Sequence, residues 1–194
     1  GGGWPTERYG RKWTLFSAGV LYFVSAVWSG LAPGVYSLMI ARFIGGVGVG
    51  MSTVASPLYI SEISPAHARG RLAGMFQFNI VFGILVAYLS NALLGGIGPN
   101  AWRWMLGVEA FPALLFTVLC VWLPESPRWL IAHKGDRDAG LHVFRSLNPG
   151  LPEAQHQAMA DDVEASVGRR EDAARFFTRR LMRPILLAFL VAFF

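Results

Sequence analysis

Residues 72–101 read LAGMFQFNIVFGILVAYLSNALLGGIGPNA, thirty positions without one charged side chain. A helix needs about 20 predominantly apolar residues to cross a bilayer. The stretch therefore predicts a membrane-spanning segment, which we place at residues 72–94, before the glycine-rich turn. It should be a helix, because an open strand would leave backbone groups unpaired in lipid.

Similar apolar stretches lie on both sides of this segment. Residues 13–32 carry no charge, residues 37–61 carry only Arg42, and residues 104–123 carry only Glu109. The sequence thus predicts an all-α integral membrane protein with four complete spans, followed by a partial fifth. We expect the four spans at residues 13–32, 37–61, 72–94 and 102–123, and the start of the fifth at residues 184–194.

The composition agrees with a membrane protein. Of the 194 residues, 54% are hydrophobic and only 15% are charged, whereas a soluble domain carries about 25% charged residues. The chain opens in a glycine-rich segment without Met, so we expect its natural N-terminus to be missing.

The basic residues occupy alternate connections between the spans. Three precede the first span, two separate the second from the third, and ten lie between the fourth and the fifth. Positive charge gathers in cytoplasmic loops. We therefore predict that residues 1–12, 62–71 and 124–183 are cytoplasmic, in a multi-pass protein of the plasma (cell inner) membrane.

The net charge of +5 and the pI near 9.9 also raise the question of nucleic-acid binding. The distribution of charge argues against it, because residues 124–183 hold ten basic side chains beside nine acidic ones. The expected partner is the lipid bilayer. Short helices on the membrane face are expected in this segment, at 136–147, at 152–167 and around 172–181.

Arg42 and Glu109 are charged groups inside predicted spans. Such a charge costs roughly 2.5–3.5 kcal/mol on insertion scales, so it usually faces a partner in the bundle. Both lie about six residues, or about 9 Å, below the same interface. We expect a buried ion pair, or two members of a proton relay whose third acid is absent here. A static pair that only orders the bundle is the alternative.

Gln77, in the third span, is the candidate for contact with a solute. A buried amide offers both a donor and an acceptor, which suits a hydroxyl-rich molecule. A hydrogen bond between helices is the alternative role.

A group of charged side chains gathers at the predicted cytoplasmic ends of the spans. Salt bridges among them could lock one conformation, although exposed pairs are weak singly and solvated charges that set the topology are the alternative. The group comprises Glu7, Arg8, Arg11, Lys12, Glu62, Arg69, Arg71, Glu125 and Arg128.

The sequence contains no pattern typical of an enzyme. The four histidines show no metal-ligand spacing, and there is no nucleophile motif or phosphate-binding loop. We expect no enzyme activity, no metal and no cofactor, with a proton gradient as the driving force.

Several motifs in order resemble the sugar porter family of the major facilitator superfamily. They are Glu7-Arg8 with Gly10-Arg11-Lys12, then Arg42 with Gly46 and Gly48, then the set Ile44, Gly46, Val47, Gly50, Tyr59, Glu62 and Arg69, and finally the run Pro124-Glu125-Ser126-Pro127-Arg128. The resemblance covers nearly the whole chain.

This resemblance implies that the spans are helices 3 to 6 of the N-terminal half, with helix 7 begun. Helices 1 and 2 and the C-terminal half would be the missing remainder of the chain and its partners in the fold. It further implies that Gln77 binds sugar hydroxyls and that Arg42 and Glu109 interact with an acid of helix 1 in proton-coupled members. The charged helix ends would stabilise the outward-facing state, and residues 124–183 would form the intracellular helical domain.

The expected function is therefore proton-coupled import of a monosaccharide by alternating access, the two halves rocking about a central site. A uniporter, a carrier of a polyol, cyclitol or organic acid, and a transporter-like sugar sensor are the alternatives that the sequence leaves open.

Overall fold

The computed structural model describes residues 3–64 and 68–172, and within these ranges it contains nine helices and no strand. The helices are α1 Gly3–Tyr9, α2 Arg11–Leu31, α3 Val35–Ile63, α4 Arg69–Leu94, α5 Ala101–Gly107, α6 Ala110–Trp122, α7 Pro127–Ala132, α8 Arg137–Leu147 and α9 Glu153–Asp172. The predicted fifth span at 184–194 and the predicted helix around 172–181 lie outside the described residues, apart from Asp172 itself.

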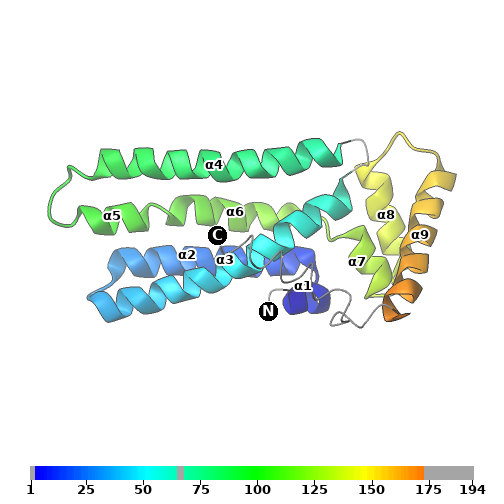
Figure 1. The fold of residues 1–194 in the computed structure, drawn as a ribbon, viewed down its shortest axis with the longest axis horizontal. Helices are drawn as coiled ribbons and strands as arrows, with labels where there is room; N and C mark the ends of the chain where they lie inside the picture. Colours follow the sequence, from blue (N-terminus) through cyan, green and yellow to red (C-terminus); the bar gives the residue numbers. More distant parts are fainter. Residues whose placement is uncertain (1–2, 65–67, 173–194) are drawn as a thin grey trace, which may run out of the picture.

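Helices α2, α3 and α4 and the pair α5–α6 form an elongated bundle, with α7, α8 and α9 at one end (Figure 1). Each of the four segments is long and apolar enough to cross a membrane. The predicted all-α architecture with four spans is confirmed. The predicted boundaries are short by two or three residues at several ends, since α3 starts at Val35 and α4 at Arg69.

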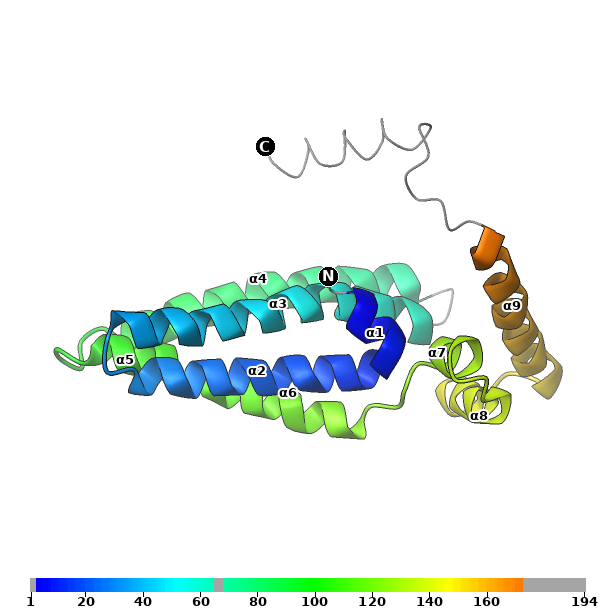
Figure 2. The same ribbon diagram turned by 90° about the horizontal axis from the view of Figure 1, so that it is seen from below.

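The two ends of the bundle differ. The connections α2–α3 and α4–α5 lie at one end, which we call the turn end (Figures 1 and 2). Helices α1 and α7–α9 lie at the other, which we call the helical-domain end. The described parts of all three segments predicted to be cytoplasmic therefore meet at the helical-domain end.

Small residues set the packing of α2 at the centre of the bundle. Ala18 and Ala26 of α2 are buried, and a Cβ added at Gly48 of α3 would lie 3.2 Å from the Ala18 carbonyl oxygen. Close approach of backbones through small residues is the usual basis of helix association in lipid. By contrast, no residue in the apolar window of α4 is buried.

The fourth span runs from Ala101 to Trp122, close to the predicted residues 102–123. Its helical hydrogen bonding is irregular at Val108 and Glu109, between α5 and α6, although both residues keep right-handed helical backbone angles. Pro112 gives the reason, because it has no N–H to donate to the Val108 carbonyl and its ring crowds that group. The Val108 carbonyl instead accepts a tighter bond from the Phe111 amide, at 3.1 Å.

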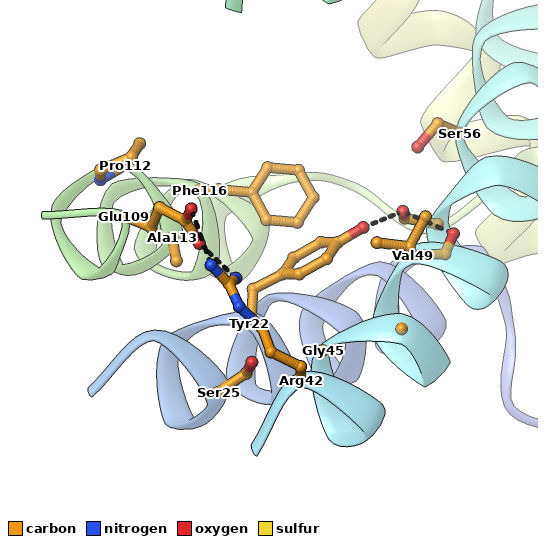
Figure 3. A pocket seen from close by; sticks show the side chains of 12 residues that line it. Tyr22, Ser25, Arg42, Gly45, Val49, Ser56, Glu109, Pro112, Ala113 and Phe116 are labelled. Carbon is orange, nitrogen blue, oxygen red and sulfur yellow. Dashed lines mark hydrogen bonds and ion pairs between the residues drawn. The ribbon is translucent and has the colours of Figure 1, made fainter. Parts of the chain in front are cut away.

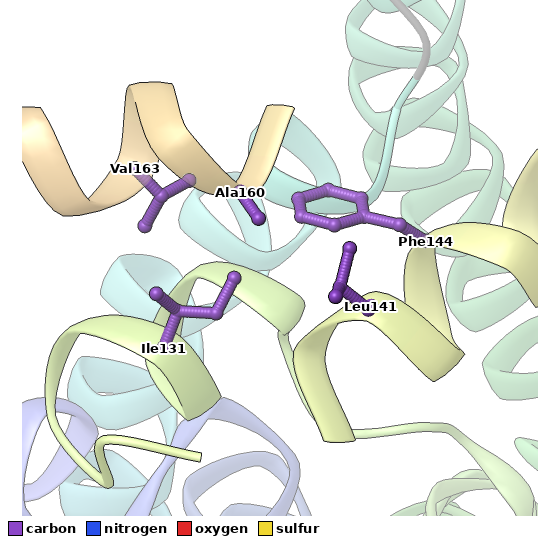
Figure 4. Close-up of a cluster of buried hydrophobic side chains, with 5 residues drawn as sticks. All are labelled: Ile131, Leu141, Phe144, Ala160 and Val163. Atoms are coloured by element: carbon purple, nitrogen blue, oxygen red, sulfur yellow. The ribbon is translucent and has the colours of Figure 1, made fainter. Parts of the chain in front are cut away.

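Helices α7, α8 and α9 enclose a small core of their own, which we call the helical domain. Its buried side chains interdigitate in Figure 4, and they are Ile131, Leu141, Phe144, Ala160 and Val163. The Asp136 side chain caps α8 by accepting from the Ala139 amide. Helix α8 matches the predicted helix at 136–147.

Two expectations for the connecting segments are wrong. The helix predicted to end at residue 167 continues to Asp172 as α9 and includes Gly168. Residues 3–9, predicted as part of a loop, form α1. The turn between α1 and α2 falls at Gly10, whose φ of 91° favours glycine.

Candidate functional site

A cavity of about 630 Å³ lies between α2, α3 and α6 and is lined by both Arg42 and Glu109 (Figure 3). Its walls combine hydroxyl groups, glycines and two aromatic rings. The lining residues are Tyr22, Ser25, Arg42, Gly45, Gly46, Val49, Ser52, Ser56, Glu109, Pro112, Ala113 and Phe116.

Arg42 and Glu109 form an ion pair across this cavity. Arg42 Nη1 lies 2.9 Å from Glu109 Oε2, and Nη2 lies 3.4 Å from Oε1. The guanidinium therefore donates to both carboxylate oxygens. Glu109 lies at the irregular turn of the fourth span, immediately before α6.

The predicted contact between the two charges is therefore formed. Within this segment the Arg42 side chain is 41% exposed and that of Glu109 is 51% exposed, on the cavity that both line. The role of the pair in proton coupling stays a prediction.

Hydroxyl groups extend the polar lining away from the ion pair. Tyr22 Oη lies 2.5 Å from Ser52 Oγ, and Ser52 itself donates to the Val49 carbonyl. The Tyr22 hydroxyl is therefore the donor to Ser52. Figure 3 shows the Tyr22 ring lying across the cavity, with the Phe116 ring facing it from α6.

The hydroxyl residues and glycines that line the cavity were not predicted as site residues. A signal was present, because Ser52 and Ser56 are four residues apart and so share one face of α3. Gly45 allows close contact with α2, since a Cβ there would lie 2.5 Å from Ser25 Oγ. A larger residue would require the Ser25 side chain to move.

Gln77 does not lie at this cavity. It is an exposed residue of α4, and α4 contributes none of the lining residues. The structure therefore does not bring Gln77 together with Arg42 and Glu109. Its predicted contact with a solute stays a prediction.

A second set of charges joins three helices at the helical-domain end. Arg11, at the start of α2, lies against Glu62, near the end of α3, with Nη2–Oε1 at 2.8 Å and Nε–Oε2 at 2.9 Å. Both side chains are nearly buried, at 7% and 11% exposure. Arg11 Nη1 also donates to the Thr6 carbonyl of α1.

Glu125 completes this cluster by capping α2. Its Oε1 accepts from the backbone amides of Arg11 at 2.9 Å and Lys12 at 3.1 Å. These are unpaired amides of the first turn, where a carboxylate also meets the positive end of the helix dipole. Glu125 therefore ties the segment after α6 to the start of α2.

Ser126 links the cluster to the helical domain. Its Oγ donates to Glu62 Oε2 and accepts from the Trp129 amide at 3.3 Å, so it caps α7 as well. We call Arg11, Glu62, Glu125 and Ser126 the end cluster. The sequence analysis missed the role of Ser126, although Ser followed by Pro is a typical helix start.

Three of the nine predicted network residues belong to the end cluster, namely Arg11, Glu62 and Glu125. The other six contribute differently. Lys12 supplies a backbone amide, and Glu7 supplies a carbonyl that accepts from Trp129 Nε1 at 2.7 Å. The side chains of Arg8, Arg71 and Arg128 are exposed, and the structure describes only the backbone of Arg69.

Comparison with known proteins places these features in a family. The family model "Sugar (and other) transporter" matches residues 1–194. The chain belongs to the sugar transporter family. Within it, this segment has the fold of the sugar porters of the major facilitator superfamily, a family of transporters and not of enzymes.

Two relatives show how much of a whole protein the chain represents. It is 41% identical over 177 residues to the galactose-proton symporter of Escherichia coli K12, covering 91% of this chain and 37% of the relative. It is 34% identical over 191 residues to the arabinose-proton symporter of the same strain, covering 97% and 39%. The chain thus spans less than half the length of these relatives.

A solved structure gives the same picture. The chain is similar to a proton:xylose symporter of the major facilitator superfamily bound to 6-bromo-6-deoxy-D-glucose, with a TM-score of 0.83 and 32% identity. The match covers 90% of this chain and 41% of that one. Together with the four apolar spans, it shows a segment of a multi-pass membrane protein.

Proposed function

We propose that the chain is part of a proton-coupled monosaccharide importer that works by alternating access. The observation that carries the proposal is the Arg42–Glu109 ion pair, which lines an open cavity within the spans. The relatives named as proton symporters of arabinose and galactose support it. A proton gradient would be the driving force, with no cofactor.

The pair offers a simple way to couple a proton to a conformational change. Protonation of the Glu109 carboxylate removes its negative charge, and the Arg42 guanidinium then loses its counter-ion. Arg42 would turn to another acid, one supplied by the remainder of the protein. A charged group within a span is costly without a partner, so each protonation state would favour a different arrangement of helices.

The end cluster would hold one of the two arrangements. Its bonds join the starts of α2 and α7 to the end of α3, so relative motion of these helices at the helical-domain end must break them. In the proposal this end faces the cytoplasm of a cell whose inner membrane holds the protein. The cluster would then close the cytoplasmic side while the outward-facing state binds sugar, with Gln77 as a sugar ligand.

The test uses the full-length protein that contains this segment, reconstituted in vesicles. Uptake of radiolabelled galactose, arabinose and xylose is measured with and without an inward proton gradient. The proposal predicts accumulation above equilibrium that a protonophore abolishes. Equilibration without accumulation would indicate a uniporter, and no uptake of any sugar would favour a polyol or organic acid carrier or a sensor.

A further inference from the structure

A second cavity, of about 570 Å³, lies at the turn end of the bundle between the ends of α2, α4 and α5. Val27, Leu31, Leu94 and Trp104 supply apolar walls, whereas Asn100 and Arg103 supply polar groups. It lies at the opposite end of the bundle from the end cluster, and neither charge of the Arg42–Glu109 pair lines it.

Arg103 is the unusual member of this lining. Its Nε is buried and, within the described part of the chain, has no hydrogen-bond partner. The guanidinium lies over the Trp102 ring, with 5.0 Å between its central carbon and the ring centroid. No carboxylate among the described residues forms an ion pair with it. The group thus presents a positive charge and an unused donor beside an apolar cavity.

The position of Arg103 along the spans indicates which kind of group could accept hydrogen bonds from its guanidinium. It lies in the first turn of α5, near the end of α2 at Leu31 and the end of α4 at Leu94. Trp102 and Trp104 flank it and are both exposed, as in the aromatic belts at membrane interfaces. Arg103 therefore lies at the level where phospholipid phosphates lie.

We propose that this cavity binds an anionic phospholipid. The phosphate accepts from the Nη groups of Arg103, and one acyl chain follows the apolar wall formed by Val27, Leu31 and Trp104. The choice of an anionic headgroup rests on charge complementarity, because the guanidinium lines a mainly apolar cavity without a carboxylate partner among the described residues. Gly30 and Gly107 let α2 approach α5 closely at the cavity, since a Cβ at Gly30 would lie 3.1 Å from Gly107 Cα.

The full-length protein tests this in nanodiscs that contain equal amounts of phosphatidylglycerol and phosphatidylcholine. Native mass spectrometry then measures the ratio of the two lipids retained on the protein. We expect enrichment of phosphatidylglycerol, and a fall of about fivefold in Arg103→Gln, as for loss of one basic contact with lipid. Arg103→Lys should keep part of the enrichment, and Lys134→Gln, at an exposed position of the helical domain, should keep all of it.

Leu31→Trp provides a second variant that keeps the charge and fills the cavity. Leu31 is 72% exposed, so the larger ring should be tolerated, and phosphatidylglycerol should be lost as in Arg103→Gln. Unchanged lipid ratios in either folded variant would overturn the proposal. So would a wild-type ratio equal to that of the nanodisc, which would mean that another part of the protein fills the cavity.

Discussion

The Arg42 guanidinium binds both oxygens of the Glu109 carboxylate at the point where the hydrogen bonding of the fourth span is irregular. Pro112 accounts for the irregularity, because it cannot donate to the Val108 carbonyl. The ion pair therefore lies beside a tight turn within the span.

Pro112→Ala should restore regular helical hydrogen bonding between α5 and α6, because residue 112 could then donate to the Val108 carbonyl. Relaxation of the tight turn should shift Glu109 relative to Arg42. In the full-length protein we expect a lower steady-state accumulation of sugar, with exchange of labelled for unlabelled sugar retained. Pro57→Ala is the matched control, since Pro57 lies inside α3 and does not line the cavity. Wild-type accumulation in Pro112→Ala would contradict this account of the tight turn.

Ser126→Ala should weaken the end cluster. The substitution removes the donor to Glu62 and the acceptor for the Trp129 amide, each worth about 1 kcal/mol. We expect a lower melting temperature and faster exchange of the α7 amides. Ser146→Ala is the control, because Ser146 is exposed and bonds only its own helix at the His142 carbonyl. Equal effects of the two substitutions would show that the cluster adds no stability.

Gly140→Ala should disrupt the core of the helical domain. A Cβ at this position would lie 2.5 Å from Ile131 Cγ1, and overpacking of this kind costs about 1–3 kcal/mol. Hydrogen exchange of residues 127–166 in the full-length protein should increase. Gly150→Ala, where a Cβ would meet no atom within 4 Å, should leave exchange unchanged. The same protection in both variants would rule out tight packing at Gly140.

Acid should loosen the contact between α8 and α9. Arg145 donates to Glu153, with Nε–Oε2 at 3.0 Å, and this hydrogen bond lowers the pKa of the Glu153 carboxyl below its ordinary value of 4.5. A lowered pKa means that the pair stabilises the fold above pH 4.5 and that this contribution is lost as the pH falls through the lower value. The effect should be small, because the pair is exposed.

Hydrogen-exchange protection factors of α8 and α9, measured across this acid range, test the prediction. Arg145→Gln should lower protection at neutral pH and remove the part of the acid response that comes from this pair. An acid response identical in wild type and Arg145→Gln would assign the loosening to other groups.

The spans could be predicted from the sequence because membrane crossing depends on local properties. Thirty uncharged residues around Gln77 leave few alternatives to a helix in lipid. The contact between Arg42 and Glu109 was also predictable, since equal depth and opposite charge need only the helical rise. The irregular hydrogen bonding at Glu109 was predictable too, because the sequence shows Pro112 three residues later.

Other features depend on neighbours that the sequence does not specify. The set of helices that line the cavity around the Arg42–Glu109 pair is one example, because hydropathy contains no such information. Glu125 is a further example, since its bond to the Arg11 amide joins residues 114 positions apart. Its charge was visible in the sequence, whereas its role as a cap for another helix was not.

Proton movement on addition of sugar is the most direct test of the coupling role of Glu109. Full-length wild type and Glu109→Gln are compared in de-energised vesicles while the external pH is recorded. The account predicts that sugar makes the medium more alkaline with wild type and leaves it unchanged with Glu109→Gln, which still exchanges labelled sugar. Equal alkalinisation by both proteins would contradict it.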